Sequence, residues 1–330
     1  MNIQLKQRNY RKPLSFLVGF YVLTLSGFAC LPYWPSSSWM LATLISFSPL
    51  WPYALPLFLL VPACFVTRQY RLIAALVVAA WLLIKISGAV FFAAGEVSDS
   101  SDPLVVITAN MGGGSIDALN KLIVENNADL IALQEVSEAW LAPLLSMSPL
   151  NVVCEGELCL LSHLKLKLVD AKSRRLLQDS GQFALQVEVE LPTGALDFYV
   201  LHLKSPRTGF QALMANPVKG WRKLREVTDE MVTESWIASS WVAQGRHSLV
   251  AGDFNLPKMN PMYQQYWHGF SDTFDEGGAG FGYSKYTRLH GIQIDHILHS
   301  QGWIAAKTWI GPSLGGDHYP VITFLTPNTR

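Results

Sequence analysis

The first third of the chain is dominated by long apolar runs. Residues 13–67 contain no charged side chain, and residues 72–94 contain one charge, Lys85. A membrane-spanning helix needs about 20 apolar residues, so these runs have room for three spans. We expect spans at about residues 14–34, 39–66 and 72–94, with Pro35-Ser36-Ser37-Ser38 as a turn between the first two. Residues 1–95 are therefore predicted to form an N-terminal membrane anchor.

Beyond residue 102 the pattern changes to short apolar runs that end in polar, Gly and Pro residues. β-branched and aromatic side chains in these runs favour strands, at residues 104–109, 129–133, 158–161, 183–191, 196–203, 248–255, 292–299 and 321–325. Helical periodicity is expected from Ser115, a capping residue, to about residue 127, and again over residues 216–244. Strands that outnumber helices predict an α+β domain of packed sheets with helices outside, over residues 103–330. Residues 96–102 form a short acidic linker.

Charge is distributed unevenly and suggests an orientation. Residues 1–95 carry 7 Lys/Arg and no Asp/Glu, whereas the remainder carries 18 Lys/Arg and all 25 Asp/Glu, a formal charge of −7. Basic residues mark the cytoplasmic flanks of membrane spans, and here they precede the first span and separate the second from the third, as Arg68 and Arg71. Three spans then place the domain outside the cytoplasm, in the periplasm or the cell exterior, anchored to the inner or plasma membrane.

Two further features bear on this topology. A cleaved signal peptide is the alternative for residues 1–30, but two more apolar runs follow and no small-residue cleavage pattern stands out. Cys30 and Cys64 fall within predicted spans, whereas Cys154 and Cys159 lie close together in the domain. In an oxidising compartment this second pair is a candidate disulfide. The acidic domain also argues weakly against broad electrostatic binding of nucleic acid.

Polar residues with metal- or phosphate-binding chemistry recur at the ends of the predicted strands. Asp253 and Asn255 stand two positions apart, so on a regular strand both side chains face the same way. Comparable placements are seen for Asn110, Glu135, His202, Asp295, Asp317 and His318. Singly, each has an ordinary explanation as a turn former, a solvated loop residue or a core histidine. Together they favour one shared site.

These residues carry a family resemblance. The sequence resembles the endonuclease/exonuclease/phosphatase superfamily over about residues 103–326, in the family's order, through Thr108-Ala109-Asn110, Leu133-Gln134-Glu135-Val136, Leu201-His202-Leu203, Gly252-Asp253-Phe254-Asn255, Ile294-Asp295-His296-Ile297 and Gly316-Asp317-His318-Tyr319-Pro320. The resemblance implies a four-layer α/β sandwich around two mixed sheets. It also implies an active site at the sheet edge where these strand ends meet.

The resemblance further implies metal-assisted attack of water on phosphorus, with Mg²⁺ or Mn²⁺ as cofactor, since oxygen ligands suit these ions. Glu135 would be the principal metal ligand, and Asn110 and Asp317 would lie on the metal side of the site. Asp253 would activate the water, and Asn255 would hold the phosphate or a second metal.

The two histidines of the site receive separate roles from the resemblance. His318 would contact a phosphoryl oxygen, with its imidazole oriented by Asp295. His202 would act as general acid toward the leaving group. Arg207 is a candidate for a second substrate phosphate, although an exposed basic loop explains it equally well. His296 departs from the family pattern and is expected to be structural.

The function expected is therefore that of a membrane-tethered, metal-dependent phosphoesterase. Its substrate is a nucleic acid, a phospholipid or a small phosphoester, and the sequence leaves nuclease and lipid or small-molecule hydrolase open. The alternative of another class is a catalytically silent, membrane-anchored binding or scaffold module that kept the fold. Besides the substrate, the lipid bilayer is the predicted partner, through the anchor, and no protein partner is inferred.

Overall fold

The computed structural model describes residues 3–91, 103–177, 179–245 and 247–328. It divides into a helical unit, Met1–Ala89 with Met259–Pro261, and a sandwich unit, Val90–Lys258 with Met262–Arg330. The predicted linker, residues 96–102, lies outside the described residues.

The helical unit contains one helix that is long and apolar enough to span a membrane. Its elements are α1 (Ile3–Ala29), two short 3₁₀ turns (Leu31–Tyr33 and Ser36–Ser38), α2 (Trp39–Ser46), α3 (Trp51–Val66) and α4 (Arg71–Ser87). Within the described residues, this helix is the Lys12–Ala29 part of α1. The segments Ser36–Ser46 and Trp51–Val66 could form a second span only if they cross the membrane together, and they are bent by 73°.

The bounds of the expected spans therefore need correction. The helix in the first ends at Ala29, and the second is broken into α2 and α3, next to the prolines at positions 49 and 52. The helix in the third ends at Ser87, where Gly88 adopts a left-handed φ of +68° that glycine accommodates without strain. A three-span anchor stays a prediction.

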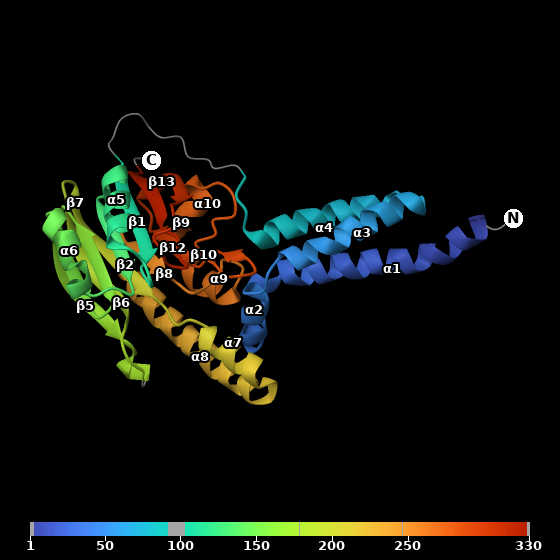
Figure 1. Cartoon of the computed structure of the whole chain (residues 1–330), viewed down its shortest axis with the longest axis horizontal. Helices are drawn as coiled ribbons and strands as arrows, with labels where there is room; N and C mark the ends of the chain where they lie inside the picture. The colour runs from blue at the N-terminus through green and yellow to red at the C-terminus, as the bar shows by residue number, and fades with distance from the viewer. Residues whose placement is uncertain (1–2, 92–102, 178, 246, 329–330) are drawn as a thin grey trace. The chain divides into compact units, whose positions relative to one another are not determined.

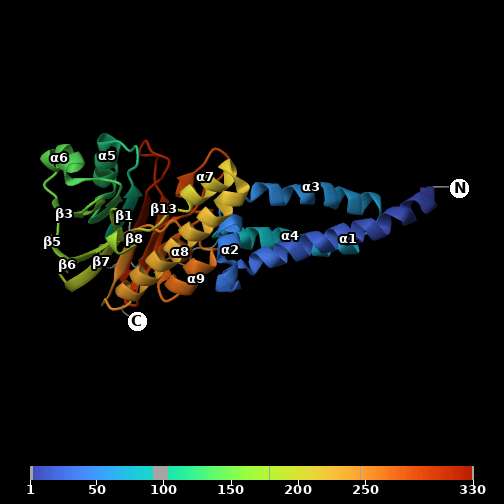
Figure 2. The same cartoon turned by 90° about the horizontal axis from the view of Figure 1, so that it is seen from below.

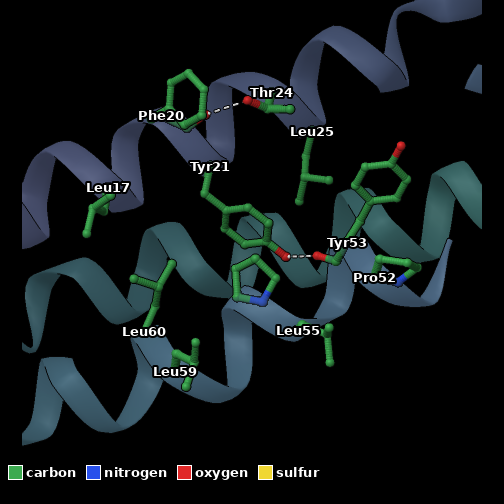
Figure 3. Close-up of a pocket in the computed structure, with 11 residues that line it drawn as sticks. Leu17, Phe20, Tyr21, Thr24, Leu25, Pro52, Tyr53, Leu55, Leu59 and Leu60 are labelled. Atoms are coloured by element: carbon green, nitrogen blue, oxygen red, sulfur yellow. Dashed lines mark hydrogen bonds between the residues drawn. The ribbon is translucent and has the colours of Figure 1, made fainter.

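An apolar cleft of about 440 Å³ lies between α1 and α3 (Figure 3). Its walls include Leu17 and Phe20 of α1 and Leu55 and Leu59 of α3. One polar contact crosses it, because the Tyr21 hydroxyl donates a hydrogen bond of 2.6 Å to the backbone carbonyl of Tyr53. The buried phenol thus has the partner that burial demands.

The sandwich unit contains two mixed six-stranded sheets (Figure 1). The first has the order β13-β14-β1-β2-β4-β3, from β13 (Trp303–Ile310), β14 (Val321–Pro327), β1 (Leu104–Asn110), β2 (Leu130–Gln134), β4 (Leu158–Ser162) and β3 (Asn151–Glu155). The second has the order β5-β6-β7-β8-β12-β9, from β5 (Lys165–Ser173), β6 (Gln182–Leu191), β7 (Gly194–His202), β8 (Leu249–Asp253), β12 (Asp295–His299) and β9 (Ser271–Asp272). A small hairpin pairs β10 (Lys285–Tyr286) with β11 (Gly291–Ile292).

Alternation along the strands builds the layers. In β1, Val106 faces the core between the two sheets, whereas Val105 and Ile107 face the helices outside the first sheet. That outer face is covered by α5 (Ile116–Asn126) and α6 (Glu138–Met147). The second sheet is contacted by α8 (Pro217–Val242), where Tyr199 of β7 packs edge-on against Trp241. Helix α7 (Arg207–Ala215) packs beside α8 (Figure 2). The predicted α+β sandwich of two mixed sheets between helices is confirmed.

The predicted elements agree with the structure except at two strands. Helix α5 begins after Ser115, whose hydroxyl accepts a hydrogen bond from the Ala118 amide as a cap. The run 248–255 stops as a strand at Asp253, and the run 292–299 is divided between β11 and β12. Sequence patterning missed several elements, namely β3, β5, β9, β10, β13, α6, α7, α9 (Pro261–Trp267) and α10 (Thr273–Gly277).

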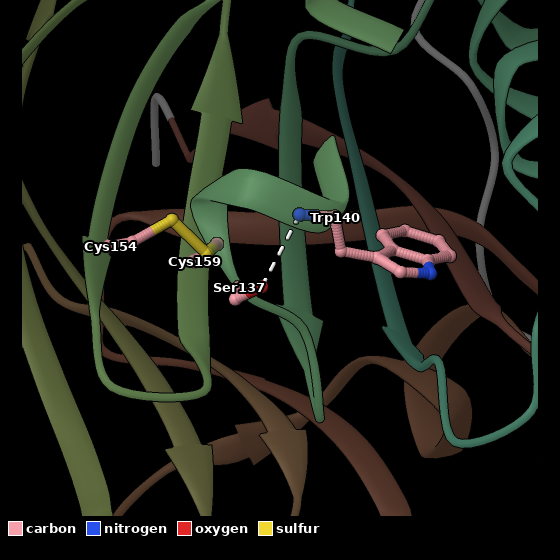
Figure 4. Close-up of a disulfide and its surroundings, with 4 residues drawn as sticks. All are labelled: Ser137, Trp140, Cys154 and Cys159. Atoms are coloured by element: carbon pink, nitrogen blue, oxygen red, sulfur yellow. Dashed lines mark hydrogen bonds between the residues drawn. A yellow bond between two sulfur atoms is a disulfide. The ribbon is translucent and has the colours of Figure 1, made fainter. Parts of the chain in front are cut away.

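A disulfide joins the two cysteines of the sandwich unit (Figure 4). Cys154 of β3 and Cys159 of β4 lie directly opposite each other in the antiparallel hairpin, with Cα atoms 4.2 Å apart. The bond closes the hairpin near the start of α6, where Ser137 caps the helix by accepting from the Trp140 amide. It staples an edge strand of the first sheet to its neighbour.

Candidate active site

Strand register brings three predicted residues side by side at one edge of the second sheet. His202 is paired with Asp253 in the parallel ladder of β7 and β8. Asp253 is paired in turn with Asp295 across β8 and β12. Because His202 and Asp253 end parallel strands, their side chains reach the same edge. In the first sheet, Asn110 ends β1 opposite the residue before Glu135, which gives a second row.

Two backbone features shape this edge. Gly252 approaches β7 so closely that a Cβ atom there would lie 2.0 Å from the Leu201 carbonyl oxygen, and its φ is +154°. A side chain before Asp253 is therefore excluded. Glu135 and Asn255 adopt left-handed φ values of +59° and +48°, which are uncommon for residues with side chains. The spacing of Asp253 and Asn255 predicted that both side chains face the same way. The left-handed backbone at Asn255 shows instead that this residue does not continue the strand.

Asp253 is the centre of the site. Its carboxylate is almost completely buried. Oδ2 accepts a hydrogen bond of 3.2 Å from Asn110 Nδ2 and lies 3.8 Å from His202 Nε2 and 3.7 Å from His318 Nε2. Oδ1 accepts a 2.9 Å bond from the Asn255 amide. One carboxylate oxygen thus faces both candidate histidines, which is the geometry of a group that can exchange protons.

His318 and Asp295 form a buried pair beside it. The imidazole Nδ1 lies 2.9 Å from Asp295 Oδ2 and 3.1 Å from Oδ1. Burial works to lower the pKa of His318, but the Asp295 carboxylate, helped by Asp253, outweighs it and raises that pKa to about 9. With Nδ1–H directed at Asp295, Nε2 is turned toward Asp253 and the site.

Lys285 of β10 is a site residue that sequence reasoning missed. Its Nζ lies 2.6 Å from His318 Nε2 and 3.0 Å from Asp317 Oδ2. An ammonium only donates, so this contact is a hydrogen bond only while His318 is neutral and Nε2 is free to accept. Lys285 therefore opposes the rise in the pKa of His318, although the nearby carboxylates outweigh it. Burial works to raise the pKa of Asp317, but hydrogen bonding to Lys285 outweighs it and lowers that pKa. Asp317 is thus engaged by a cation, with a side chain that is 55% exposed.

Glu135 and Asn110 form the candidate metal side of the site. Asn110 Nδ2 donates to Glu135 Oε1 over 2.8 Å, while Asn110 Oδ1 accepts from the Gly112 amide over 3.0 Å. The Asn110 amide nitrogen therefore orients the two carboxylates, while its amide oxygen is hydrogen-bonded to the backbone. Glu135 Oε1 lies 3.8 Å from His202 Nε2, and its side chain is 42% exposed. An accessible carboxylate next to the buried Asp253 suits a hard divalent ion that retains waters.

A second group of possible metal ligands consists of Asp253, Asp295 and His318. Among the described residues, one ligand atom each from Asp253, Asp295 and His318 lies within 4.8 Å of the others. In this grouping Asp295 is already hydrogen-bonded to His318 Nδ1. We therefore interpret the Asp295–His318 pair as acid–base machinery and the Glu135–Asp253 side as the oxygen-rich ion site.

Two of the predicted site residues, Asn255 and Arg207, do not point at the central carboxylates. Asn255 Nδ2 donates to the backbone carbonyl of Leu203 over 2.9 Å, so its amide joins the ends of β7 and β8. Arg207 is exposed in the first turn of α7. Within the part of the chain that the structure describes, its guanidinium forms no ion pair. The structure does not bring Arg207 into contact with the central carboxylates.

A buried ion pair behind His202 was also missed. Arg174 Nε lies 2.7 Å from Glu234 Oε1, and Nη2 donates to the His202 carbonyl over 2.5 Å. Glu234 Oε2 accepts from the Lys204 amide over 2.7 Å. The pair therefore holds the end of β7. One feature could have indicated it, because Glu234 occupies a buried position of α8, three residues after Met231.

His296 faces away from Asp295 and is fully buried. Its Nδ1 lies 2.9 Å from Asp272 Oδ2, and its Nε2 lies 3.0 Å from the Leu256 carbonyl oxygen. Asp272 is also contacted by the Tyr263 hydroxyl and Lys258 Nζ. These contacts tie the segment after Asn255 to β12, on the side of the sheet remote from the site.

Comparison with known proteins agrees with this fold. The model of the endonuclease/exonuclease/phosphatase family matches residues 107–318. A search of curated proteins finds no match. Among solved structures, a family protein from Leptotrichia buccalis is similar with 14% identity and a TM-score of 0.53, covering 68% of this chain and 99% of that one. Humanized D. rerio TDP2 is similar with 16% identity and a TM-score of 0.52, covering 68% and 100%.

A third similar structure is a 3′ phosphatase, NExo, from Neisseria, bound to a product DNA hairpin. It shows 14% identity and a TM-score of 0.51, covering 67% of this chain and 98% of that one. The two-sheet sandwich is the fold that these solved structures share with this chain. The chain belongs to the endonuclease/exonuclease/phosphatase family, whose members are metal-dependent phosphoesterases.

Proposed function

We propose that this protein is a membrane-tethered phosphoesterase that uses Mg²⁺ or Mn²⁺ to hydrolyse a phosphodiester or phosphomonoester. The observation that carries the proposal is the position of Asp253, whose Oδ2 lies within 3.8 Å of His202 Nε2 and 3.7 Å of His318 Nε2. A buried carboxylate between two imidazoles, with an accessible Glu135 beside it, provides the groups that phosphoester hydrolysis needs.

Each residue has a role in this mechanism. Glu135 binds the metal, with Asn110 fixing its carboxylate by the 2.8 Å hydrogen bond. A divalent ion held there would supply Lewis-acid chemistry, offsetting negative charge on the phosphoryl and leaving oxygens. Asp253 orients the attacking water and takes its proton. His202 donates a proton to the leaving group from the opposite side of Asp253.

His318 completes the reaction centre by donating from Nε2 to a phosphoryl oxygen. Asp295 supports this role, because a carboxylate on Nδ1 fixes the tautomer and stabilises the charged imidazole. Asn255 supports the phosphate side by joining the strand ends, and Asp317 remains a candidate outer ligand of the metal. Arg207 remains the candidate contact to a second phosphate of a larger substrate.

The proposed substrates are a nucleic acid, a phospholipid or a small phosphoester. The similar 3′ phosphatase from Neisseria is bound to a product DNA hairpin, which favours testing nucleic acid first. The test is hydrolysis of DNA, RNA, phospholipid vesicles and sugar phosphates by the detergent-solubilised full chain, with Mg²⁺, with Mn²⁺ and with EDTA. Metal-dependent hydrolysis that is lost in Asp253→Asn is expected. Equal residual activity in the wild type and this variant with every substrate would overturn the proposal.

We propose further that residues 1–95 anchor the protein in the inner or plasma membrane, with residues 103–330 on the periplasmic or extracellular side. The apolar α1 and the basic residues before it, Lys6, Arg8, Arg11 and Lys12, support this topology. A phosphatase reporter fused after residue 94 is expected to be active only outside the cytoplasm. Activity of a cytoplasmic reporter at the same position, with the phosphatase fusion silent, would reverse the orientation.

A further inference from the structure

We propose that Lys285 is a substrate-binding residue whose ammonium holds a non-bridging oxygen of the phosphoryl group next to His318. This inference rests on the proposed function and adds a cation to the site. The starting observation is that Nζ lies 2.6 Å from His318 Nε2, the atom proposed to meet the phosphoryl oxygen. Any oxygen that binds at Nε2 therefore comes within reach of the ammonium as well.

The backbone holds Lys285 at this place. Lys285 and His318 form an antiparallel bridge. On the neighbouring residue, the Tyr286 amide donates to the Asp317 carbonyl over 3.0 Å. The Lys285 stem therefore starts from a backbone that is hydrogen-bonded to the loop bearing His318. A cation placed this way needs little reorganisation to meet a bound anion.

Ser284 secures the other side of the same hairpin. Its hydroxyl accepts from the Asp295 amide over 3.0 Å and from the Ile294 amide over 3.2 Å. Its carbonyl accepts from the Tyr319 amide over 2.6 Å. The hairpin is thus bonded both to the strand of Asp295 and to the loop of His318, the two members of the buried pair.

The ion pairing of Lys285 leaves it available to a ligand. Its carboxylate partner is Asp317, at 3.0 Å, and the two side chains are 25% and 55% exposed. A partly exposed pair of this kind contributes little to stability, so an incoming phosphate displaces it at low cost. Lys204 is less available to a ligand, because two carboxylates, Asp179 and Glu230, lie 2.6 and 2.8 Å from its ammonium.

The charge of the site gives Lys285 its importance. Glu135, Asp253, Asp295 and Asp317 bring four carboxyl groups to the place where an anionic substrate must bind. The metal is proposed to lie by Glu135, whereas Lys285 lies on the His318 side. A fixed ammonium there offsets repulsion between the phosphoryl oxygens and the nearby carboxylates, and it stabilises negative charge that develops on these oxygens.

The experiment compares Lys285→Ala and Lys285→Arg with Lys172→Ala in the detergent-solubilised full chain. Lys172 is a matched control, because its side chain is 26% exposed and pairs with Asp170 on β5, outside the site. One readout is kcat/KM for bis(4-nitrophenyl) phosphate and 4-nitrophenyl phosphate with Mg²⁺. The other is the Kd of inorganic phosphate, measured by calorimetry in the presence of Mg²⁺, which does not require turnover.

We expect kcat/KM to fall about 10- to 100-fold in Lys285→Ala, with phosphate binding about 10-fold weaker. Lys285→Arg, which keeps the charge, should recover a large part of both, and Lys172→Ala should change neither. Unchanged kinetics and phosphate affinity in Lys285→Ala would overturn the role of Lys285 and leave the proposed function intact. If the wild type hydrolyses neither nitrophenyl ester, phosphate affinity alone decides the role of Lys285: weaker binding in Lys285→Ala supports the site, and equal binding refutes it. The proposed function is then decided separately, by the screen of DNA, RNA, phospholipid vesicles and sugar phosphates.

Discussion

Asp253 Oδ2 lies 3.7 Å from His318 Nε2, although one residue ends a strand of the second sheet and the other lies in the loop that leads into the first. Asp253 ends β8 of the second sheet, whereas His318 stands shortly before β14 of the first. The site therefore depends on the packing of one sheet on the other. A carboxylate oxygen and an imidazole nitrogen this close, and not hydrogen-bonded to each other, can both contact one bound group from adjacent positions.

Asp253→Asn is expected to abolish hydrolysis with little effect on the fold. The substitution keeps the shape but removes the proton acceptor, so kcat should fall by about 10²–10⁴-fold. Asp129→Asn is the matched control, because Asp129 lies at the other end of the strands and accepts from the Val105 amide. Full activity in Asp253→Asn, measured with the substrate found in the screen, would remove Asp253 from the mechanism.

The pKa of His318 can be measured directly in metal-free protein. With its pKa raised to about 9 by Asp295 and Asp253 against the effect of burial, His318 should remain protonated at neutral pH. In Asp295→Asn the main raising influence is gone while burial persists, so the pKa should fall to about 6.5 or below. Carbon-13 NMR of labelled histidine in EDTA gives both values. A wild-type midpoint below pH 7 would contradict the charged pair.

Linkage gives this pair a pH-dependent contribution to stability. Because the folded-state pKa of His318 lies above its unfolded value, the stabilisation is fully present below about pH 6.5 and is lost as pH rises through about 9. The same pair orients Nε2, so activity that needs the protonated imidazole should decline in that alkaline range.

Metal binding is expected to depend on Glu135. Glu135→Gln removes the accessible carboxylate charge, so the Kd of Mn²⁺, measured by electron paramagnetic resonance, should rise about 10-fold or more. Glu138→Gln serves as control, because Glu138 begins α6 three residues later. EDTA should inactivate the wild type, and added Mg²⁺ or Mn²⁺ should restore it. Equal Mn²⁺ affinity in Glu135→Gln and Glu138→Gln would place the ion elsewhere.

Much of this site could be predicted because strand ends are visible in the sequence. Gly252-Asp253 follows a short apolar run, and a strand that ends in a carboxylate at a sheet edge can be predicted without a structure. Ser115 and the helix after it are equally local. Such features depend on residues close together in the chain, where spacing and propensity carry the information.

Contacts made across the fold were beyond the sequence. Lys285 lies in a two-residue strand, too short to give a period, and its partner His318 is reached only through the bridge between hairpin and loop. The strand expected to continue to Asn255 ends early because that residue takes a left-handed conformation. Backbone geometry of this kind is set by tertiary packing.

The buried pair Arg174–Glu234 is expected to be important for stability at neutral pH. Glu234 is 1% exposed and Arg174 13%. Burial raises the pKa of Glu234, while Arg174 opposes that rise. Arg174→Met leaves a buried charge without its partner, so we expect a loss of about 3–5 kcal/mol in the free energy of unfolding. Thermal unfolding of the full chain, followed by tryptophan fluorescence, measures it.

The pH dependence distinguishes a lost charge partner from lost packing. Without Arg174, the pKa of Glu234 rises further, and the folded state then binds a proton that the unfolded state lacks. Stability of Arg174→Met should therefore increase as pH falls through that raised value. The double variant Arg174→Met/Glu234→Leu should recover much of the loss, because neither charge remains buried. A deficit equal at pH 5 and pH 8, and undiminished in the double variant, would mean that Arg174 acts through the His202 carbonyl and packing alone.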